Sequence, residues 1–100
     1  MFPLIVFRRG NLDVALFCIS YDLIKGKDYP KLWNELDRLG GHKALESFYL
    51  IDLNNTASEV RDHLKGFVDE DDMLMVIEFS KKPVFVKAKK GTNDWLDKHF

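Results

Sequence analysis

The residue with the most distinct chemical potential is Asp22, which ends a run of alternating side chains over residues 13–22. A carboxylate at the end of a strand offers the hard oxygen ligands that Mg²⁺ binds, and Mg²⁺ needs few of them from the protein. A strand-terminal aspartate also suits a turn or a cap, and both interpretations stand. The functional one is a pair of Asp22 carboxylates, one from each copy of a dimer, that hold one Mg²⁺ ion and activate water for phosphodiester hydrolysis.

The densest basic segment spans residues 81–90 and includes Lys87 and Lys89. Lysines at this density can contact the phosphates of a nucleic acid. They also protect the exposed edge of a sheet against pairing with other chains, so the segment is open to either role.

Other catalytic patterns are not suggested by the sequence. No metal-ligand spacing links the histidines His42, His63 and His99. His63 is expected on a solvated helix face without a chemical role. No Cys–His or Ser–His–Asp constellation can be argued, and no glycine loop that would cradle a phosphate is present.

Length and composition favour one globular domain. The chain has 100 residues, of which 46% are hydrophobic, and 15 basic and 16 acidic residues give a net charge of −1. This balance predicts no strong long-range attraction to nucleic acid or to an anionic membrane, so nucleic acid would need a local patch. Cys18 is the single cysteine, which excludes an intrachain disulfide and fits the reducing cytoplasm. No segment is long and apolar enough to span a membrane.

The run over residues 13–22 predicts a central strand. Ala15, Phe17, Ile19 and Tyr21 share one face, and Val14, Leu16, Cys18, Ser20 and Asp22 share the other. Because both faces are largely apolar, both should be covered. The preceding segment, 1–12, is expected to be an edge strand or arm, with a grip on a partner subunit as the alternative.

The next elements follow from periodicity and capping. A helix should begin near Tyr29 after an Asp28 cap, with Glu35 and Arg38 on its solvated side, and end at Gly40. Residues 42–53 alternate again and predict two strand pieces with a bend near Glu46.

The second half of the chain completes the pattern. Residues 56–59 form a capping box that opens a second helix, and the acidic run 69–72 predicts a solvated loop. Residues 73–79 predict a third buried strand, residues 84–89 an edge strand, and Thr92 the start of a short terminal helix.

This order predicts an α+β ferredoxin-like sandwich (βαββαβ) with an extra C-terminal edge strand. The core would span residues 13–80, and residues 81–100 would add the strand and short helix. Both long helices would cover one face of the sheet, which leaves an apolar face without cover. We therefore expect a homodimer with the two sheets facing each other and the two Asp22 residues meeting across the cleft.

Three segments resemble the CRISPR-associated Cas-two family: Ile19–Asp22, Gly41–Tyr49 and Asp71–Val76. The outline is also similar to that of virulence-associated protein D, a related ribonuclease toxin. The resemblance covers residues 14–79 and implies a dimeric ferredoxin-like protein of defence, toxin or mobile-element biology.

By this resemblance the protein would be a magnesium-dependent endonuclease acting on RNA or DNA, with Asp22 as its metal ligand. The alternative is a catalytically inactive homodimeric scaffold or regulator that binds another protein subunit. The residues that would contact nucleic acid are Lys25, Lys27, Lys43, Ser47, Lys87 and Lys89.

Overall fold

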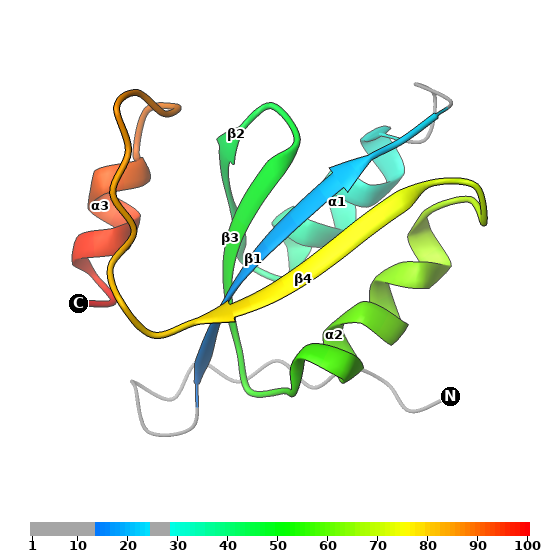
Figure 1. Cartoon of the computed structure of the whole chain (residues 1–100), viewed down its shortest axis with the longest axis horizontal. Coiled ribbons are helices and arrows are strands. Elements are labelled where there is room, and N and C mark those ends of the chain that lie inside the picture. The colour runs from blue at the N-terminus through cyan, green and yellow to red at the C-terminus, as the bar shows by residue number, and fades with distance from the viewer. Residues whose placement is uncertain (1–13, 25–28) are drawn as a thin grey trace.

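The computed structural model describes residues 14–24 and 29–100 (Figure 1). Four strands form an antiparallel sheet in the order β2-β3-β1-β4. The expected N-terminal arm, the Asp28 cap, Lys25 and Lys27 lie outside the described residues.

The central strand is β1 (Ala15–Asp22), which pairs with β3 on one side and β4 on the other. Its alternation is confirmed, because Phe17, Ile19 and Tyr21 are buried in the main core. Helices α1 (Tyr29–Arg38) and α2 (Ala57–Leu64) cover this face. A short 3-10 turn, η2 (Lys65–Phe67), extends α2.

Strands β2 (His42–Leu45) and β3 (Phe48–Leu53) form a hairpin. The predicted division of residues 42–53 into two pieces is confirmed, with a register irregularity between Lys43 and Leu45. The capping box before α2 is also confirmed, since Thr56 Oγ1 accepts a hydrogen bond from the Glu59 N–H while the Glu59 carboxylate accepts one from the Thr56 N–H.

The last part of the chain differs from the prediction at two points. Strand β4 (Met73–Phe79) and helix α3 (Thr92–Asp97) form at the expected residues, but β4 is not the buried strand that was predicted, because it lies at the edge of the sheet with Met73, Met75 and Ile77 exposed. Residues 84–89 are not a strand. The segment runs as a loop beside β2 and makes one backbone contact there, from Lys89 N to Ala44 O at 2.8 Å. The alternating pattern was therefore insufficient, because a strand also needs a partner along its length.

The second face of the sheet is only partly covered. Helix α3 places Leu96 against Cys18, Ala44 and Leu50, which form a smaller buried cluster. Met73, Met75 and Ile77 of β4 remain exposed on the same face. The fold is thus α+β, with a strand order compatible with a ferredoxin-like sandwich.

Candidate functional site

Asp22 lies at the end of β1, opposite Met73 of β4. Its side chain shares a face with Ser20, away from α1 and α2. The residue is exposed, and its carboxylate makes no hydrogen bond or ion pair with any residue the structure describes. Within the described part of the chain, its oxygens are therefore available to a ligand.

A shallow hollow of about 540 Å³ adjoins this carboxylate. Its walls come from the end of β1 and the beginning of β4, namely Ser20, Tyr21, Asp22, Asp72, Met73, Leu74 and Met75. The hollow thus combines the exposed Asp22 carboxylate with thioether and aliphatic side chains.

The second carboxylate of the hollow, Asp72, is engaged in hydrogen bonds to the backbone. Its Oδ1 accepts a hydrogen bond from Ile24 N at 2.8 Å, and its Oδ2 accepts one from Asp69 N at 2.7 Å. Asp72 therefore joins the turn before β4 to Ile24, just after the end of β1, and of the two carboxylates that line the hollow only Asp22 has no hydrogen bond within the residues described.

A magnesium ion fits these residues only in part. Among the residues described, no three His, Cys, Asp or Glu side chains come together as a metal site. Mg²⁺ is usually held by one or two carboxylates and retains several waters, so Asp22 can serve as one ligand. The other carboxylate of the hollow, Asp72, already accepts two backbone hydrogen bonds.

Two of the predicted phosphate-binding lysines meet at Glu46 in the β2–β3 turn. Lys89 Nζ lies 3.3 Å and Lys43 Nζ 3.7 Å from the Glu46 carboxylate. The hydrogen bond from Lys89, followed by the charge of Lys43, lowers the pKa of Glu46. Both lysines are thus partly neutralised within the chain.

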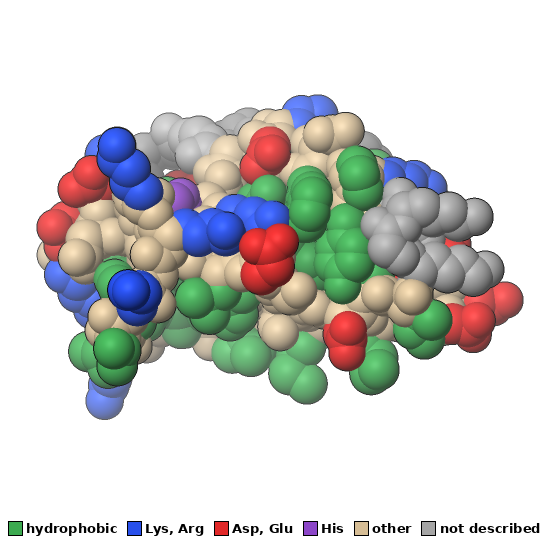
Figure 2. Space-filling view, turned by 90° about the horizontal axis from the view of Figure 1, so that it is seen from above, with side chains coloured by type: hydrophobic (Ala, Val, Ile, Leu, Met, Phe, Trp, Pro, Cys, Tyr) green, Lys and Arg blue, Asp and Glu red, His purple; other side chains and the backbone are tan. Residues whose placement is uncertain are grey.

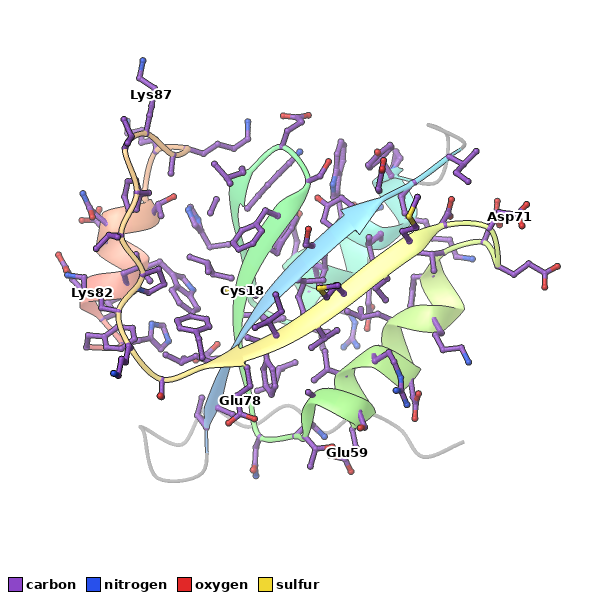
Figure 3. The ribbon with its side chains drawn as sticks, in the orientation of Figure 1. Cys18, Glu59, Asp71, Glu78, Lys82 and Lys87 are labelled. Carbon is purple, nitrogen blue, oxygen red and sulfur yellow. The ribbon has the colours of Figure 1, made fainter. Side chains whose placement is uncertain are left out.

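The remaining predicted residues are dispersed. Ser47 O accepts a hydrogen bond from Tyr21 N at 3.2 Å, so Ser47 lies beside the end of β1. Lys87 extends from the 80–91 loop into solvent, far from Asp71 at the start of β4 (Figure 3). Figure 2 views the end of the sheet where β1 finishes and shows basic, acidic and hydrophobic side chains side by side.

A buried aromatic network supports this end of the sheet. Tyr21 Oη accepts a hydrogen bond from Trp33 Nε1 at 2.7 Å and donates one to Glu46 O at 3.3 Å. Burial raises the pKa of Tyr21 to about 12, so the hydroxyl keeps its proton in neutral solution. Lys43 Nζ lies 3.5 Å from the centre of the Trp33 ring. The network fixes the β2–β3 turn against α1.

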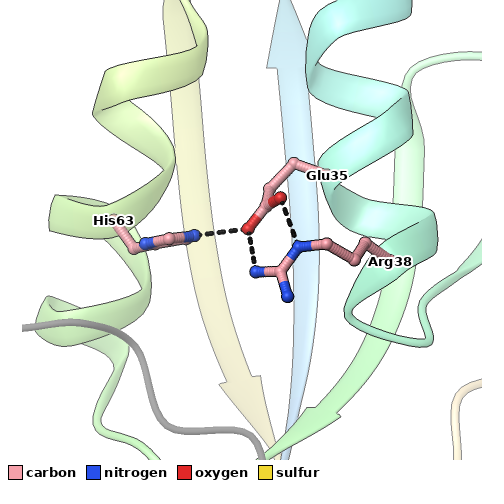
Figure 4. Close-up of polar contacts among 3 residues, drawn as sticks. All are labelled: Glu35, Arg38 and His63. Carbon is pink, nitrogen blue, oxygen red and sulfur yellow. Dashed lines mark hydrogen bonds and ion pairs between the residues drawn. The ribbon is translucent and has the colours of Figure 1, made fainter.

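The sequence did not reveal a polar cluster between α1 and α2, formed by Glu35, Arg38 and His63 (Figure 4). Glu35 Oε2 lies 2.6 Å from both Arg38 Nη2 and His63 Nε2, and Arg38 Nε donates to Oε1 at 2.8 Å. The Glu35 side chain is only 7% exposed. The Arg38 hydrogen bonds lower the pKa of Glu35 despite its burial.

Two predictions are corrected by this cluster. Glu35 was expected on the solvated side of α1 and His63 on a solvated face of α2, but the two side chains contact each other and are only 7% and 15% exposed. His63 also packs on Phe67, with ring centroids 5.3 Å apart. The i,i+3 spacing of Glu35 and Arg38 predicts an ion pair on one face of α1. It cannot predict that α2 packs against that face.

A second largely buried pair, His99 and Asp52, links the end of α3 to the open face of the sheet. His99 Nε2 lies 3.1 Å from Asp52 Oδ2, and His99 Nδ1 lies 2.7 Å from Trp95 O. The His99 ring thus links the carbonyl of Trp95 on α3 to the Asp52 carboxylate on β3. The terminal helix is held by these contacts as well as by Leu96.

No protein-family model matches the chain, and no solved structure matches it. Among the described helices, none has both the length and the apolar character needed to cross a membrane.

Proposed function

We propose that the protein acts as a homodimer in which the open sheet faces of two chains pack together. The observation that supports this is the row of exposed side chains on β4, with Met73 59%, Met75 62% and Ile77 45% exposed. Figure 2 shows hydrophobic side chains along one side of the molecule. Removing such area from water contributes about 25 cal/mol per Å², which favours a second apolar surface as the cover.

The proposed dimer supplies the carboxylate that one chain lacks. Asp22 lies on the same face as Met75 and directly opposite Met73, so a two-fold contact on this face can bring two Asp22 carboxylates to one seam. The two carboxylates would hold a hydrated Mg²⁺ ion, which supplies Lewis acidity for phosphodiester hydrolysis. The exposed position of Asp22 beside this hollow supports the ligand role.

The dimer is tested by adding one carboxylate to the open face. In Ser20→Glu the new charge lies on β1 beside Met75, so the mass in sedimentation should fall from two chains to one. Asn34→Glu adds the same charge to the exposed part of α1 and should leave the mass unchanged. A wild-type chain that sediments as one subunit at all concentrations would overturn the dimer.

The chemistry is tested by Asp22→Asn, which keeps the shape of the side chain and removes its charge. Single-stranded RNA and double-stranded DNA should be cleaved by the wild type with Mg²⁺ and left intact with chelator. Cleavage should fall at least 100-fold in Asp22→Asn and stay unchanged in Asp71→Asn, which alters an exposed loop aspartate. Equal activity in both variants would remove Asp22 from the mechanism.

A second candidate, a dimeric scaffold that binds another protein subunit, is favoured by the loop after β4. Val84 and Val86 are almost fully exposed there, outside the sheet, and lie between lysines. Such a surface suits a protein partner rather than a phosphate backbone. An intact dimer that cleaves neither nucleic acid would support the scaffold over the nuclease.

A further inference from the structure

The edge of β4 is a second apolar surface, separate from the open face. Strand β4 is the last strand of the sheet and pairs only with β1 among the described elements. All seven residues, MLMVIEF, are apolar except Glu78, and neither proline nor lysine interrupts them. Natural edge strands are normally shortened, bulged or charged to prevent pairing, and β4 has little of this protection.

A groove lies between this edge and the start of α2. A groove of about 250 Å³ is lined by Ala57, Ser58 and Arg61 of α2 and by Leu74, Met75 and Val76 of β4. Two of the three α2 residues in this lining, Ala57 and Ser58, have small side chains, and β4 has no strand on its outer side among the described elements. An extended segment could therefore add to the sheet by main-chain hydrogen bonds.

We propose that the occupant of this edge is β4 of a second copy of the chain, in antiparallel register about Val76. Full overlap of the seven residues in a two-fold pair requires Val76 to lie opposite Val76. The same register places Met75 opposite Ile77 and Leu74 opposite Glu78. It would join two four-stranded sheets into one continuous sheet.

Charge complementarity at the ends of β4 supports this occupant. Beyond the ends of the paired strands, the acidic turn residues Glu70 and Asp71 of one copy would lie on the side where Lys81 and Lys82 of the other copy follow β4, at both ends of the pair because of the two-fold axis. Figure 3 shows Asp71 beside the start of β4 and Lys82 beside α3, where Lys82 Nζ lies 2.6 Å from Asp97 Oδ1. Glu70, Asp71 and Lys81 are exposed, and they form no ion pair within the described part of the chain.

A second complementarity arises in the groove itself. Glu78 pairs with the fully buried Phe17 of β1, so its side chain lies on the helix-covered face. In the proposed register Glu78 of the second copy lies opposite Leu74, which lines the groove together with Arg61. The carboxylate would thus enter a groove that contains a guanidinium group.

The register is tested by a disulfide that the face-to-face dimer cannot form. Val76 points to the helix-covered face, so Val76→Cys can link two chains only through paired edges. Mild oxidation should convert most of this variant to a covalent dimer. Leu74→Cys, on the same strand and face, is four residues out of register and should be linked at least tenfold more slowly. The wild-type protein, oxidised in the same way, measures any linkage through Cys18, whose pKa is raised by burial.

Charge exchange provides an independent check, because all altered side chains are exposed. In the Val76→Cys background, Lys81→Glu with Lys82→Glu should slow the linkage about tenfold. Adding Glu70→Lys with Asp71→Lys should restore it. Equal linkage of Leu74→Cys and Val76→Cys, or no rescue by the charge exchange, would overturn the proposal. Ser20→Glu should not alter the linkage, which separates this contact from the proposed dimer through the sheet faces.

Discussion

The two faces of the sheet carry similar amounts of hydrophobic side chain but are covered very differently. On one face, Phe17, Ile19 and Ile51 are completely buried beneath α1 and α2. On the other, α3 covers the half next to β2, while the half formed by β4 is exposed. The same alternation of apolar residues therefore serves folding on one face and leaves an association surface on the other.

The difference follows from helix length and position. Helices α1 and α2 have 10 and 8 residues and together bury the main core on their face, whereas α3 has 6 residues and packs mainly beside β2. A short helix at one edge cannot cover a four-stranded sheet. The comparison predicts that substitutions on the covered face change the stability of the chain itself, while those on the open face change its association.

The largest effect is expected in the core of the covered face. Leu36→Ala should lower the free energy of unfolding by about 2–5 kcal/mol, because the side chain is fully buried and its removal leaves a cavity. Met75→Ala on the open face should cost under about 1 kcal/mol at concentrations where the chain is a monomer. Urea denaturation at several protein concentrations distinguishes the two. A similar loss for both variants at low concentration would contradict the comparison.

A pH effect is expected from the Glu35 cluster that joins the helices of the covered face. The folded state lowers the pKa of Glu35, so its stabilising contribution is present above about pH 4.5 and is lost as the pH falls through the lowered value. Glu35→Gln should therefore reduce the decline in stability below pH 4.5. Glu70→Gln, at an exposed loop position, should leave that decline unchanged. Thermal unfolding between pH 2 and 7 provides the measurement.

The sequence predicted the features that depend on residues close together in the chain and missed those that depend on distant ones. The faces of β1 follow from period-two alternation, and the start of α2 follows from Thr56 and Glu59, which lie three residues apart. The exposed position of Asp22 at the end of β1 was likewise local. The burial of Glu35 was not, because it depends on His63, 28 residues away.

The segment 84–89 illustrates the same limit. Its alternation is as regular as that of β1, yet it is not a strand because only Lys89 finds a backbone partner, on β2. The sequence also could not predict that Lys43 and Lys89 both contact Glu46, because this arrangement depends on the path of the loop. Local patterns specify which conformations are favourable, and tertiary partners decide which of them form.

The beginnings of α2 and α3 offer a smaller test of the comparison. Thr56→Ala removes the side-chain cap of α2 and should cost about 1 kcal/mol. Helix α3 follows Gly91, which has φ 94° and no side-chain cap, so Gly91→Ala should cost a similar amount, about 1–2 kcal/mol, through backbone strain. Hydrogen exchange should show faster opening of α2 in the first variant and of α3 in the second. Opening of both helices in either variant would indicate that the two faces are not independent.

The smallest effect is expected where lysines from both sides of the sheet reach Glu46. Lys43 lies opposite Tyr49 and contacts Trp33 on the covered side, while Lys89 arrives from the loop that leads to α3. Lys43→Gln should cost about 0.5–1 kcal/mol more than Lys89→Gln, because both remove a contact with Glu46 but only the first removes a cation–π interaction. Chemical denaturation of the two variants and of the double variant measures this difference. Equal losses would show that the contact with Trp33 adds nothing to the stability of the covered face.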